Sequence, residues 1–253
     1  MNEIIDILPY SEKTVRVRIQ NANIAVKAQP GNFVIIKFSE DGQRIPFSIV
    51  ATDPELGLID IIIHRGDGLD NILGILRRSQ HLPDLLGPLG IAADIPEGKR
   101  LLFCGDGSGF VPLLPLMRTA RTRGCHVAAI VSEFSSQMHC LLPEISASSD
   151  EVLRAEEDTF LLIASRMMYE GKVDKVIMSG PTLMMKRLAD ETRRQGVEAD
   201  CLLNMLMIDG IGLCGVCRVM VGGERKQTCT DGPIFNAHLV DFDSMLNRQR
   251  LYE

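Results

Sequence analysis

Four potential metal ligands lie close together near the C-terminal end of the chain, and their spacing points to iron-sulfur chemistry. They are Asp209, Cys214, Cys217 and Cys229, separated by four, two and eleven residues. Plant-type [2Fe–2S] proteins space four cysteines in this way, with the last one distant. Here a carboxylate, which can also bind iron, takes the first position. The glycine-rich backbone between the ligands can wrap inorganic sulfur and direct N–H groups at it. The sequence therefore predicts a [2Fe–2S] cluster.

Two other interpretations of the same residues remain open. The three cysteines could bind zinc with Asp209 or a water molecule as the fourth ligand, although structural zinc favours complete Cys/His sets. They could also be buried thiols without a metal. Disulfides are not expected, because seven cysteines is an odd number and a chain of 253 residues can bury its own core. The cysteines outside the pattern are expected to be small buried hydrophobic residues; they are Cys104, Cys125, Cys140 and Cys201.

A second candidate site is the segment Arg44-Ile-Pro-Phe-Ser-Ile49, at the start of a predicted strand. The polar edge of a flavin ring needs backbone amides and a hydroxyl such as that of Ser48. Pro46 and Phe47 would supply a stiff apolar wall, and Arg44 a positive charge. An ordinary edge strand would explain the same residues without a flavin.

A glycine turn further along could hold the diphosphate of the same cofactor. Arg65, Gly66 and Gly68 precede a predicted helix. Charge, bare backbone and a helix N-terminus together favour a diphosphate. Such turns are also common where no ligand binds.

A third candidate site is the loop between a predicted strand and helix at residues 105–109, with glycines at Gly105, Gly107 and Gly109. Such a loop lets a dinucleotide diphosphate approach the backbone at a helix N-terminus. Asp106 opposes this, because its carboxylate would face the diphosphate unless a cation such as Arg118 pairs with it. A later strand ends at Gly180 and Pro181, where an α/β sheet places its ligand crevice. A tight turn without a ligand is the alternative.

These candidate sites fall in three consecutive units that differ in their pattern of predicted strands and helices. Residues 1–97 contain short strands separated by turn signals, with one helix at 69–78, and predict a small antiparallel barrel. Residues 98–200 alternate between strand-like and helical runs, which predicts a parallel sheet with crossover helices. Residues 201–253 are short, rich in Gly and Cys, and have no long periodic element.

Composition excludes several classes of protein. The net charge is −6 and there is no run of Lys and Arg, which disfavours nucleic acid as a partner. Glycines and Asp106 interrupt the most apolar stretch, residues 101–117, so no membrane-spanning helix is expected. The first residues do not form a secretory signal, and the thiols suit a cytoplasmic location. No acid/base pair indicates a catalytic pocket, and the five histidines are assigned no chemistry.

Taken together, these motifs resemble a known family. A flavin-type barrel, a G-x-G-x-G-x-x-P loop at 105–112, a GP-x-x-MM segment at 180–185 and a cysteine loop running into Cys229-Thr-Asp-Gly-Pro-Ile-Phe235 are similar to ferredoxin-NADP-reductase-like electron-transfer subunits. The best-known member is the electron-transfer subunit of dihydroorotate dehydrogenase. Residues 203–218, with Asp at the first ligand position, and residues 238–243 more closely resemble a second branch. That branch is the small subunit of NADH-dependent reduced ferredoxin:NADP oxidoreductase and of sulfide dehydrogenase.

The resemblance implies a fold, cofactors and partners. It implies an FAD-binding barrel facing Arg44, Pro46, Phe47 and Ser48, an α/β nucleotide-binding-type domain and a [2Fe–2S] subdomain. Electrons would pass between NAD(P)H, FAD and the cluster to a larger catalytic or electron-accepting subunit, with ferredoxin as a further candidate partner.

Departures from the family pattern fall on the nucleotide site. The family usually has Gly where this chain has Asp106, and commonly Thr or Ser where it has Leu69. A family segment of the nucleotide pocket, T-x-DG-S-x-G-x-x-G, has no counterpart between Ser132 and Lys172. We therefore expect a weakened NAD(P)H site. The alternatives to a transhydrogenase-type subunit are a dihydroorotate dehydrogenase subunit and a non-catalytic flavin/iron-sulfur adaptor.

Overall fold

The structure is a computed structural model that describes residues 2–65, 70–132 and 136–249. Gly66 and Gly68, which were predicted to hold a diphosphate, lie outside the described residues, as does Leu69. None of the helices within these ranges is both long and apolar enough to cross a membrane.

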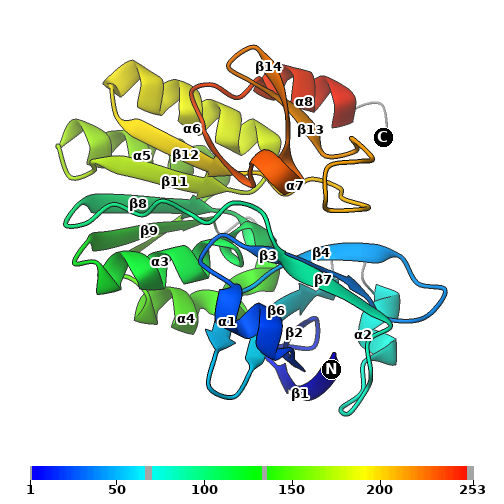
Figure 1. Ribbon diagram of the computed structural model, residues 1–253. Coiled ribbons are helices and arrows are strands. Elements are labelled where there is room, and N and C mark those ends of the chain that lie inside the picture. Colours follow the sequence, from blue (N-terminus) through cyan, green and yellow to red (C-terminus); the bar gives the residue numbers. More distant parts are fainter. Residues whose placement is uncertain (1, 66–69, 133–135, 250–253) are drawn as a thin grey trace.

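The N-terminal unit consists of two antiparallel sheets that curl around one core (Figure 1). One sheet has the order β1 (Glu3–Pro9), β2 (Thr14–Gln20), β6 (Leu58–His64), β5 (Ala51–Asp53), and the other β4 (Arg44–Ser48), β3 (Phe33–Lys37), β7 (Asp84–Leu89). The short helices α1 (Ala22–Lys27) and α2 (Asp70–Ile75) accompany them. Every residue of β6 is buried, because Ile59, Ile61 and Ile63 face the barrel core while Ile62 packs against the next domain.

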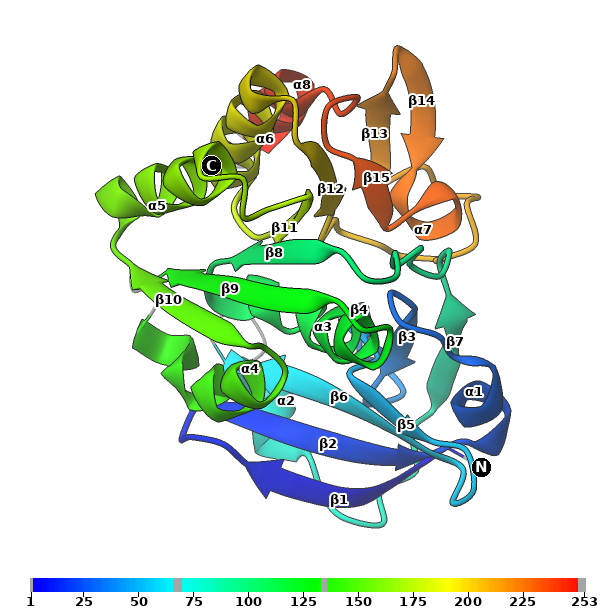
Figure 2. The same ribbon diagram turned by 90° about the vertical axis from the view of Figure 1, so that its left-hand side faces the viewer.

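The second unit is a six-stranded sheet with helices on both faces (Figure 2). Its strand order is β10 (Glu151–Ala155), β9 (His126–Ser132), β8 (Arg100–Gly105), β11 (Lys175–Ser179), β12 (Glu198–Leu202), β15 (Ile234–Asn236), and only β15 runs antiparallel to its neighbour. Helices α3 (Leu113–Thr122) and α4 (Leu142–Ala147) cover one face, and α5 (Glu157–Tyr169) and α6 (Thr182–Gln195) the other. Alternate residues of β8 serve the two cores, with Leu101 and Phe103 on one side and Leu102 and Cys104 on the other.

The order of the sheet creates a switch point between β8 and β11. From β8 the chain proceeds through β9 and β10 in one direction, and from β11 through β12 in the other. Gly105 and Ser179, the last residues of these two strands, are register partners. Open α/β sheets bind ligands at such a point, beyond the carboxyl ends of the strands.

The C-terminal residues leave and then rejoin this sheet. After β12 the chain forms an irregular loop, the hairpin β13 (Arg218–Val221) and β14 (Glu224–Gln227), and the single turn α7 (Thr228–Asp231). It returns as β15, which pairs with β12, and ends in α8 (Phe242–Gln249) beside α6. The predicted third unit thus shares a sheet with the predicted second unit.

A charged cluster joins the barrel to the α/β domain. Glu144 of α4 accepts a hydrogen bond from Tyr10 and lies 3.5 Å from the Arg16 guanidinium, both from the barrel. On the other side, Arg118 of α3 bonds Glu144 at 2.6 Å and the carbonyl of Val50 at 2.8 Å. Since these groups are at least partly buried, the contacts fix the relative orientation of the two domains.

Candidate functional site

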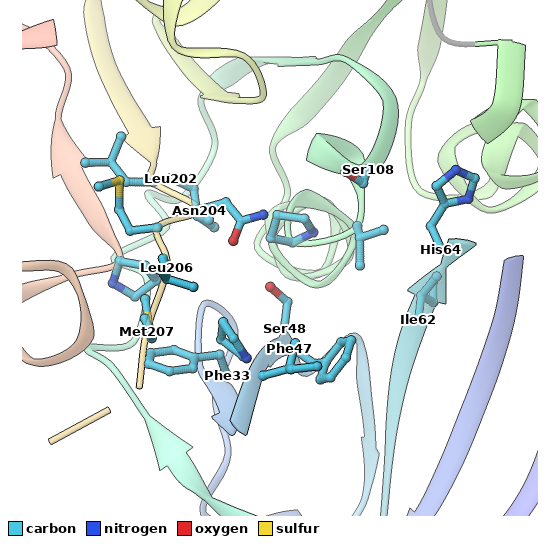
Figure 3. A pocket seen from close by; sticks show the side chains of 17 residues that line it. Phe33, Phe47, Ser48, Ile62, His64, Ser108, Leu202, Asn204, Leu206 and Met207 are labelled. Atoms are coloured by element: carbon cyan, nitrogen blue, oxygen red, sulfur yellow. The ribbon is translucent and has the colours of Figure 1, made fainter. Parts of the chain in front are cut away.

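A cavity of about 460 Å³ lies between the barrel, the start of the α3 segment and residues 202–207 (Figure 3). Pro46, Phe47 and Ser48, three of the residues predicted to face a flavin, line it. Ser108 and Pro112 from the predicted nucleotide loop also reach this cavity. The structure thus brings parts of two separately predicted sites to one place.

Few polar side chains enter this largely apolar cavity. Ser48 and Asn204 point into it from opposite sides, and Ser108 and His64 lie at its far end (Figure 3). Nδ1 of His64 lies 2.8 Å from the hydroxyl of Thr14, which holds the buried ring in place. An apolar pocket with a few fixed polar groups is typical of cofactor sites, whose volumes run from roughly 300 to 1,000 Å³.

The cavity suits the ring system of a flavin. Phe33 and Phe47 supply aromatic walls for a planar ring, and the Ser48 hydroxyl and Asn204 amide supply hydrogen bonds at its polar edge. No carboxylate lines the cavity within the described residues, so nothing there repels an electron-rich ring. The residues present therefore fit an isoalloxazine.

Sequence reasoning missed His64 and the segment around Asn204. We assigned the histidines no chemistry, yet His64 ends β6 and faces the cavity. Its position just before Arg65 was the available signal, because the diphosphate turn was placed there. Asn204 belongs to no motif, and only the return of the chain after β12 brings it to the barrel.

Arg44 is not among the residues that line the cavity. It forms an ion pair with Asp84 at 2.6 Å, and its side chain is 48% exposed. Arg65 is exposed as well. Pro46, Phe47 and Ser48 thus line the cavity, while Arg44, at the start of the same strand, does not.

This difference between Ser48 and Arg44 yields a prediction about FAD binding. Replacing Ser48 with alanine removes a neutral hydrogen bond worth about 0.5–1.5 kcal/mol, and should raise the Kd for FAD roughly two- to tenfold. Titration of the deflavinated protein with FAD measures this change. The control is Arg44→Ala, which should leave the Kd unchanged. A greater loss in Arg44→Ala than in Ser48→Ala would contradict the placement of the flavin.

The four predicted cluster ligands lie in two pairs. The Asp209 carboxylate interacts with the side chain and the backbone N–H of Cys214, and the thiols of Cys217 and Cys229 hydrogen-bond to each other. Over the described ranges, no three His, Cys, Asp or Glu side chains converge as they would around a single metal ion. A [2Fe–2S] cluster takes two protein ligands on each iron, whereas zinc needs its ligands around one point. The pairing therefore favours a binuclear cluster over zinc.

Backbone N–H groups of the loop point at these ligands. Burial raises the pKa of Asp209, but hydrogen bonds from the backbone of Ile211, Cys214 and Gly212 outweigh it and hold the pKa below its usual value. Burial, followed by the hydrogen bond with Cys217, raises the pKa of Cys229 to about 12, while the N–H of Gly212 acts in the opposite direction. The metal must therefore displace the proton of this thiol on binding.

Gly210 brings the loop into direct contact with the barrel. A Cβ at this position would lie 2.4 Å from Cδ1 of Ile35 and 2.8 Å from Cδ1 of Leu89, and the backbone φ is +70°. Both the close approach and the positive φ require glycine. The loop is thus seated on strands β3 and β7.

Two side chains of the cavity wall also pack with the thiols. Phe33 and Met207 line the cavity, and they also pack in one buried cluster with Cys217 and Cys229. These two thiols are only 1% and 2% exposed. A flavin in the cavity would therefore lie beside the buried cluster that contains these two thiols.

The predicted nucleotide residues meet at the switch point. A Cβ on Gly109 would lie 2.4 Å from the carbonyl oxygen of Ser179, so the loop rests on the end of β11. A Cβ on Gly180 would lie 3.6 Å from that of Asp106. The loop glycines and the Gly180-Pro181 turn therefore share one edge of the sheet. Arg118, considered as a partner for Asp106, bonds Glu144 and Val50 instead.

Comparison with known sequences identifies similar proteins. Residues 204–241 match the family described as the iron-sulfur cluster binding domain of dihydroorotate dehydrogenase B. The whole chain is 30% identical to 92% of a Thermotoga maritima protein named as a homologue of the electron transfer subunit of dihydroorotate dehydrogenase B (NAD(+)). Over 90% of its length it is 30% identical to that electron transfer subunit from Geobacillus thermodenitrificans, of which 92% is covered.

Solved structures show the same architecture. A structure of the NADH-dependent reduced ferredoxin-NADP oxidoreductase contains a chain similar to all of this one and covered over 94% of its own length, with a TM-score of 0.88 and 28% identity. A ferredoxin NADP+ reductase from Neisseria gonorrhoeae, solved with FAD and NADP, is similar over 77% of this chain and 90% of its own, with a TM-score of 0.58 and 16% identity. The predicted fold class, an antiparallel barrel, a parallel-sheet domain and an iron-sulfur subdomain, is confirmed.

Proposed function

Because this chain belongs to the family of dihydroorotate dehydrogenase B electron-transfer subunits and their homologues, we propose that it passes electrons between NAD(P)H and a larger partner subunit. It is an electron-transfer subunit of a flavin/iron-sulfur oxidoreductase, with FAD and an iron-sulfur cluster as cofactors. The reaction proposed is that of a complex such as NADH-dependent reduced ferredoxin-NADP oxidoreductase. A cytoplasmic location suits its thiolate ligands.

We propose that each of the three units binds one redox group. Residues 1–97 hold FAD, residues 98–200 hold the nucleotide, and residues 201–253 hold the cluster through Asp209, Cys214, Cys217 and Cys229. When bound, FAD takes up two electrons with a hydride and the cluster accepts electrons singly, which joins two-electron to one-electron chemistry. Ser48 and Asn204 orient the ring from opposite sides of the cavity, and Phe33 and Met207 exclude water between ring and thiols.

The observation that carries this proposal is that Phe33 and Met207 line the cavity and belong to the same buried cluster as the thiols of Cys217 and Cys229. Anaerobic titration with NADH or NADPH tests it, with flavin absorbance and the EPR signal of the cluster followed together. We expect the EPR signal to rise as the flavin bleaches. A fully reduced flavin beside a cluster that stays oxidised would overturn the proposal.

A second candidate function is a non-catalytic adaptor, in which flavin and cluster only connect two other proteins. The position of Asp106 beside Gly180 favours it, because this residue brings a negative charge to the loop proposed for a dinucleotide diphosphate. In this case neither NADH nor NADPH would bleach the flavin, while dithionite would reduce both cofactors.

The partner is proposed to bind over an exposed apolar surface beside the cluster loop, here called the cluster face. It consists of Leu206, Ile208, Ile211 and Leu213, which are 71%, 51%, 52% and 83% exposed. Exposed apolar groups gathered in this way mark interaction sites. Two exposed arginines adjoin it, since Arg218 donates to the carbonyl of Gly215 at 3.1 Å and Nη2 of Arg225 lies 2.9 Å from the Cβ position of the same glycine. We therefore propose a partner surface with an apolar centre and an acidic rim.

Leu213→Asp should break this complex. It places a charge at the most exposed position of the cluster face, and loss of a central apolar contact costs about 2 kcal/mol or more, over tenfold in affinity. The tagged protein is purified from its native host, and the co-purifying oxidoreductase subunit is identified by mass spectrometry and quantified. The matched control is Leu162→Asp on α5, where Leu162 is 68% exposed. Equal retention of the partner by both variants would exclude the cluster face.

A further inference from the structure

A fully buried hydroxyl beside the cluster loop has no hydrogen-bond partner. Thr228 is 0% exposed, and its Oγ1 has no partner among the described residues. It directly precedes Cys229, and its backbone N–H donates to the carbonyl of Cys217 at 3.1 Å. The main chain of Thr228 is thus fixed between two of the proposed ligands while its side chain stays unsatisfied.

The residue before Thr228, Gln227, also has a buried polar atom, its side-chain Oε1, without a hydrogen-bond partner in the described part of the chain. This oxygen lies 3.1 Å from the position that a Cβ on Gly212 would occupy, so it reaches the loop that carries the ligands. Buried polar side chains nearly always find a partner, and an unsatisfied one points to a missing ligand. The Gln227 oxygen can only accept a hydrogen bond, whereas the Thr228 hydroxyl can donate one, so of these two groups Thr228 is the one suited to an acceptor bound by the loop.

The two thiols that flank the Thr228 main chain lie in an apolar cluster. Cys217 and Cys229 pack with Phe33, Ile35 and Met207, none of which has a side chain that accepts a hydrogen bond well. A bound cluster would add sulfide and thiolate sulfurs, which accept hydrogen bonds from nearby donors. A threonine hydroxyl can rotate to donate to such a sulfur.

We propose that the Thr228 hydroxyl donates a hydrogen bond to a sulfur of the bound cluster and thereby raises its reduction potential. The inference rests on the proposed cluster ligands. The reduced cluster carries one more negative charge than the oxidised one, so a donor to its sulfur stabilises the reduced state more. Thr228 acts here as a positioning and tuning residue, since Asp209, Cys214, Cys217 and Cys229 hold the iron.

Thr228→Val distinguishes this role from a structural one. Valine has nearly the shape of threonine, so without the cluster the variant loses only an unsatisfied hydroxyl and should be as stable as the unmodified protein or more so. With the cluster bound, the same change should lower the reduction potential. At a fixed potential, the ratio of reduced to oxidised cluster should fall up to about tenfold, which is about 59 mV for a one-electron couple. A purely structural threonine would weaken both forms of the protein and leave the potential unchanged.

The measurement is a mediated redox titration of the whole protein followed by EPR, after iron and sulfide have been counted. Thr228→Ser keeps the hydroxyl and should retain the original potential. Thr230→Val makes the same substitution two residues away, at an exposed position, and should leave the potential unchanged. An unchanged potential in Thr228→Val with a full complement of iron would overturn this inference alone. Absence of iron from the unmodified protein would instead overturn the proposed cluster.

Discussion

Replacing Cys214 with alanine should remove iron and sulfide from the purified protein while FAD stays bound. The unmodified protein is expected to contain about two iron and two sulfide per chain. Cys214 is exposed, so its loss should not disturb folding, and it belongs to the loop while the flavin cavity is built mainly from the barrel and residues 202–207. Iron, sulfide and flavin analysis after anaerobic preparation measures the outcome.

Two further variants test whether the loss of iron is specific to the proposed ligands. Cys140→Ala removes a half-buried cysteine outside the loop and should keep both cofactors. Asp209→Ala leaves one iron with a single protein ligand, so the cluster should assemble and then be lost on dilution or exposure to air. Stoichiometric zinc without iron in the unmodified protein would refute the cluster. A cluster of unchanged stability in Asp209→Ala would show that this carboxylate only organises the backbone N–H groups of the loop.

Replacing Asp106 with asparagine should strengthen the binding of NADH or NADPH by a large factor. A carboxylate about 4 Å from one diphosphate charge costs on the order of 4 kcal/mol at an effective dielectric constant near 20. This corresponds to an upper limit of roughly a thousandfold in affinity. Asparagine keeps the shape of the side chain and removes only its charge. The structure places Asp106 beside Gly180 at the switch point.

The affinity is measured by titration of the oxidised protein with NAD(P)H analogues that cannot reduce the flavin. Asp41→Asn changes the net charge equally at an exposed loop position, and should leave the affinity unchanged. Nanomolar to low-micromolar affinity in the unmodified protein would contradict a weakened site. No gain in Asp106→Asn would favour the adaptor.

Features that depend on residues close together in the sequence could be predicted from the sequence. The spacing of Asp209 and the three cysteines identified the cluster loop, and the glycines at 105–109 identified an edge of the sheet that the topology places at the switch point. The helices and strand between residues 136 and 169 were not predicted; α4, for example, is only 6 residues long and carries a proline in its first turn. Burial against the sheet, which sequence does not show, defines them.

Contacts between distant segments could not be predicted. Phe33 and Met207 are 174 positions apart, yet both line the cavity and belong to the same buried cluster as the thiols. Asn204 and His64 carry no motif, and their role depends on how the chain after β12 folds back onto the barrel. The ion pair of Arg44 depends on Asp84, which belongs to another strand. Each of these facts is a property of packing, not of spacing along the chain.

The pairing of β15 with β12 has a consequence for how electrons leave the protein. Leu202 and Ile234 are register partners, so the whole excursion that carries the cluster loop is closed at its base by hydrogen bonds. Gly210 seats the same excursion on the barrel. A redox centre on a flexible tether can shuttle between donor and acceptor, whereas this segment is held both at its base and where Gly210 contacts the barrel. If the proposed flavin and cluster sites are right, we expect the distance between the two cofactors to stay nearly constant and the acceptor to bind at the cluster.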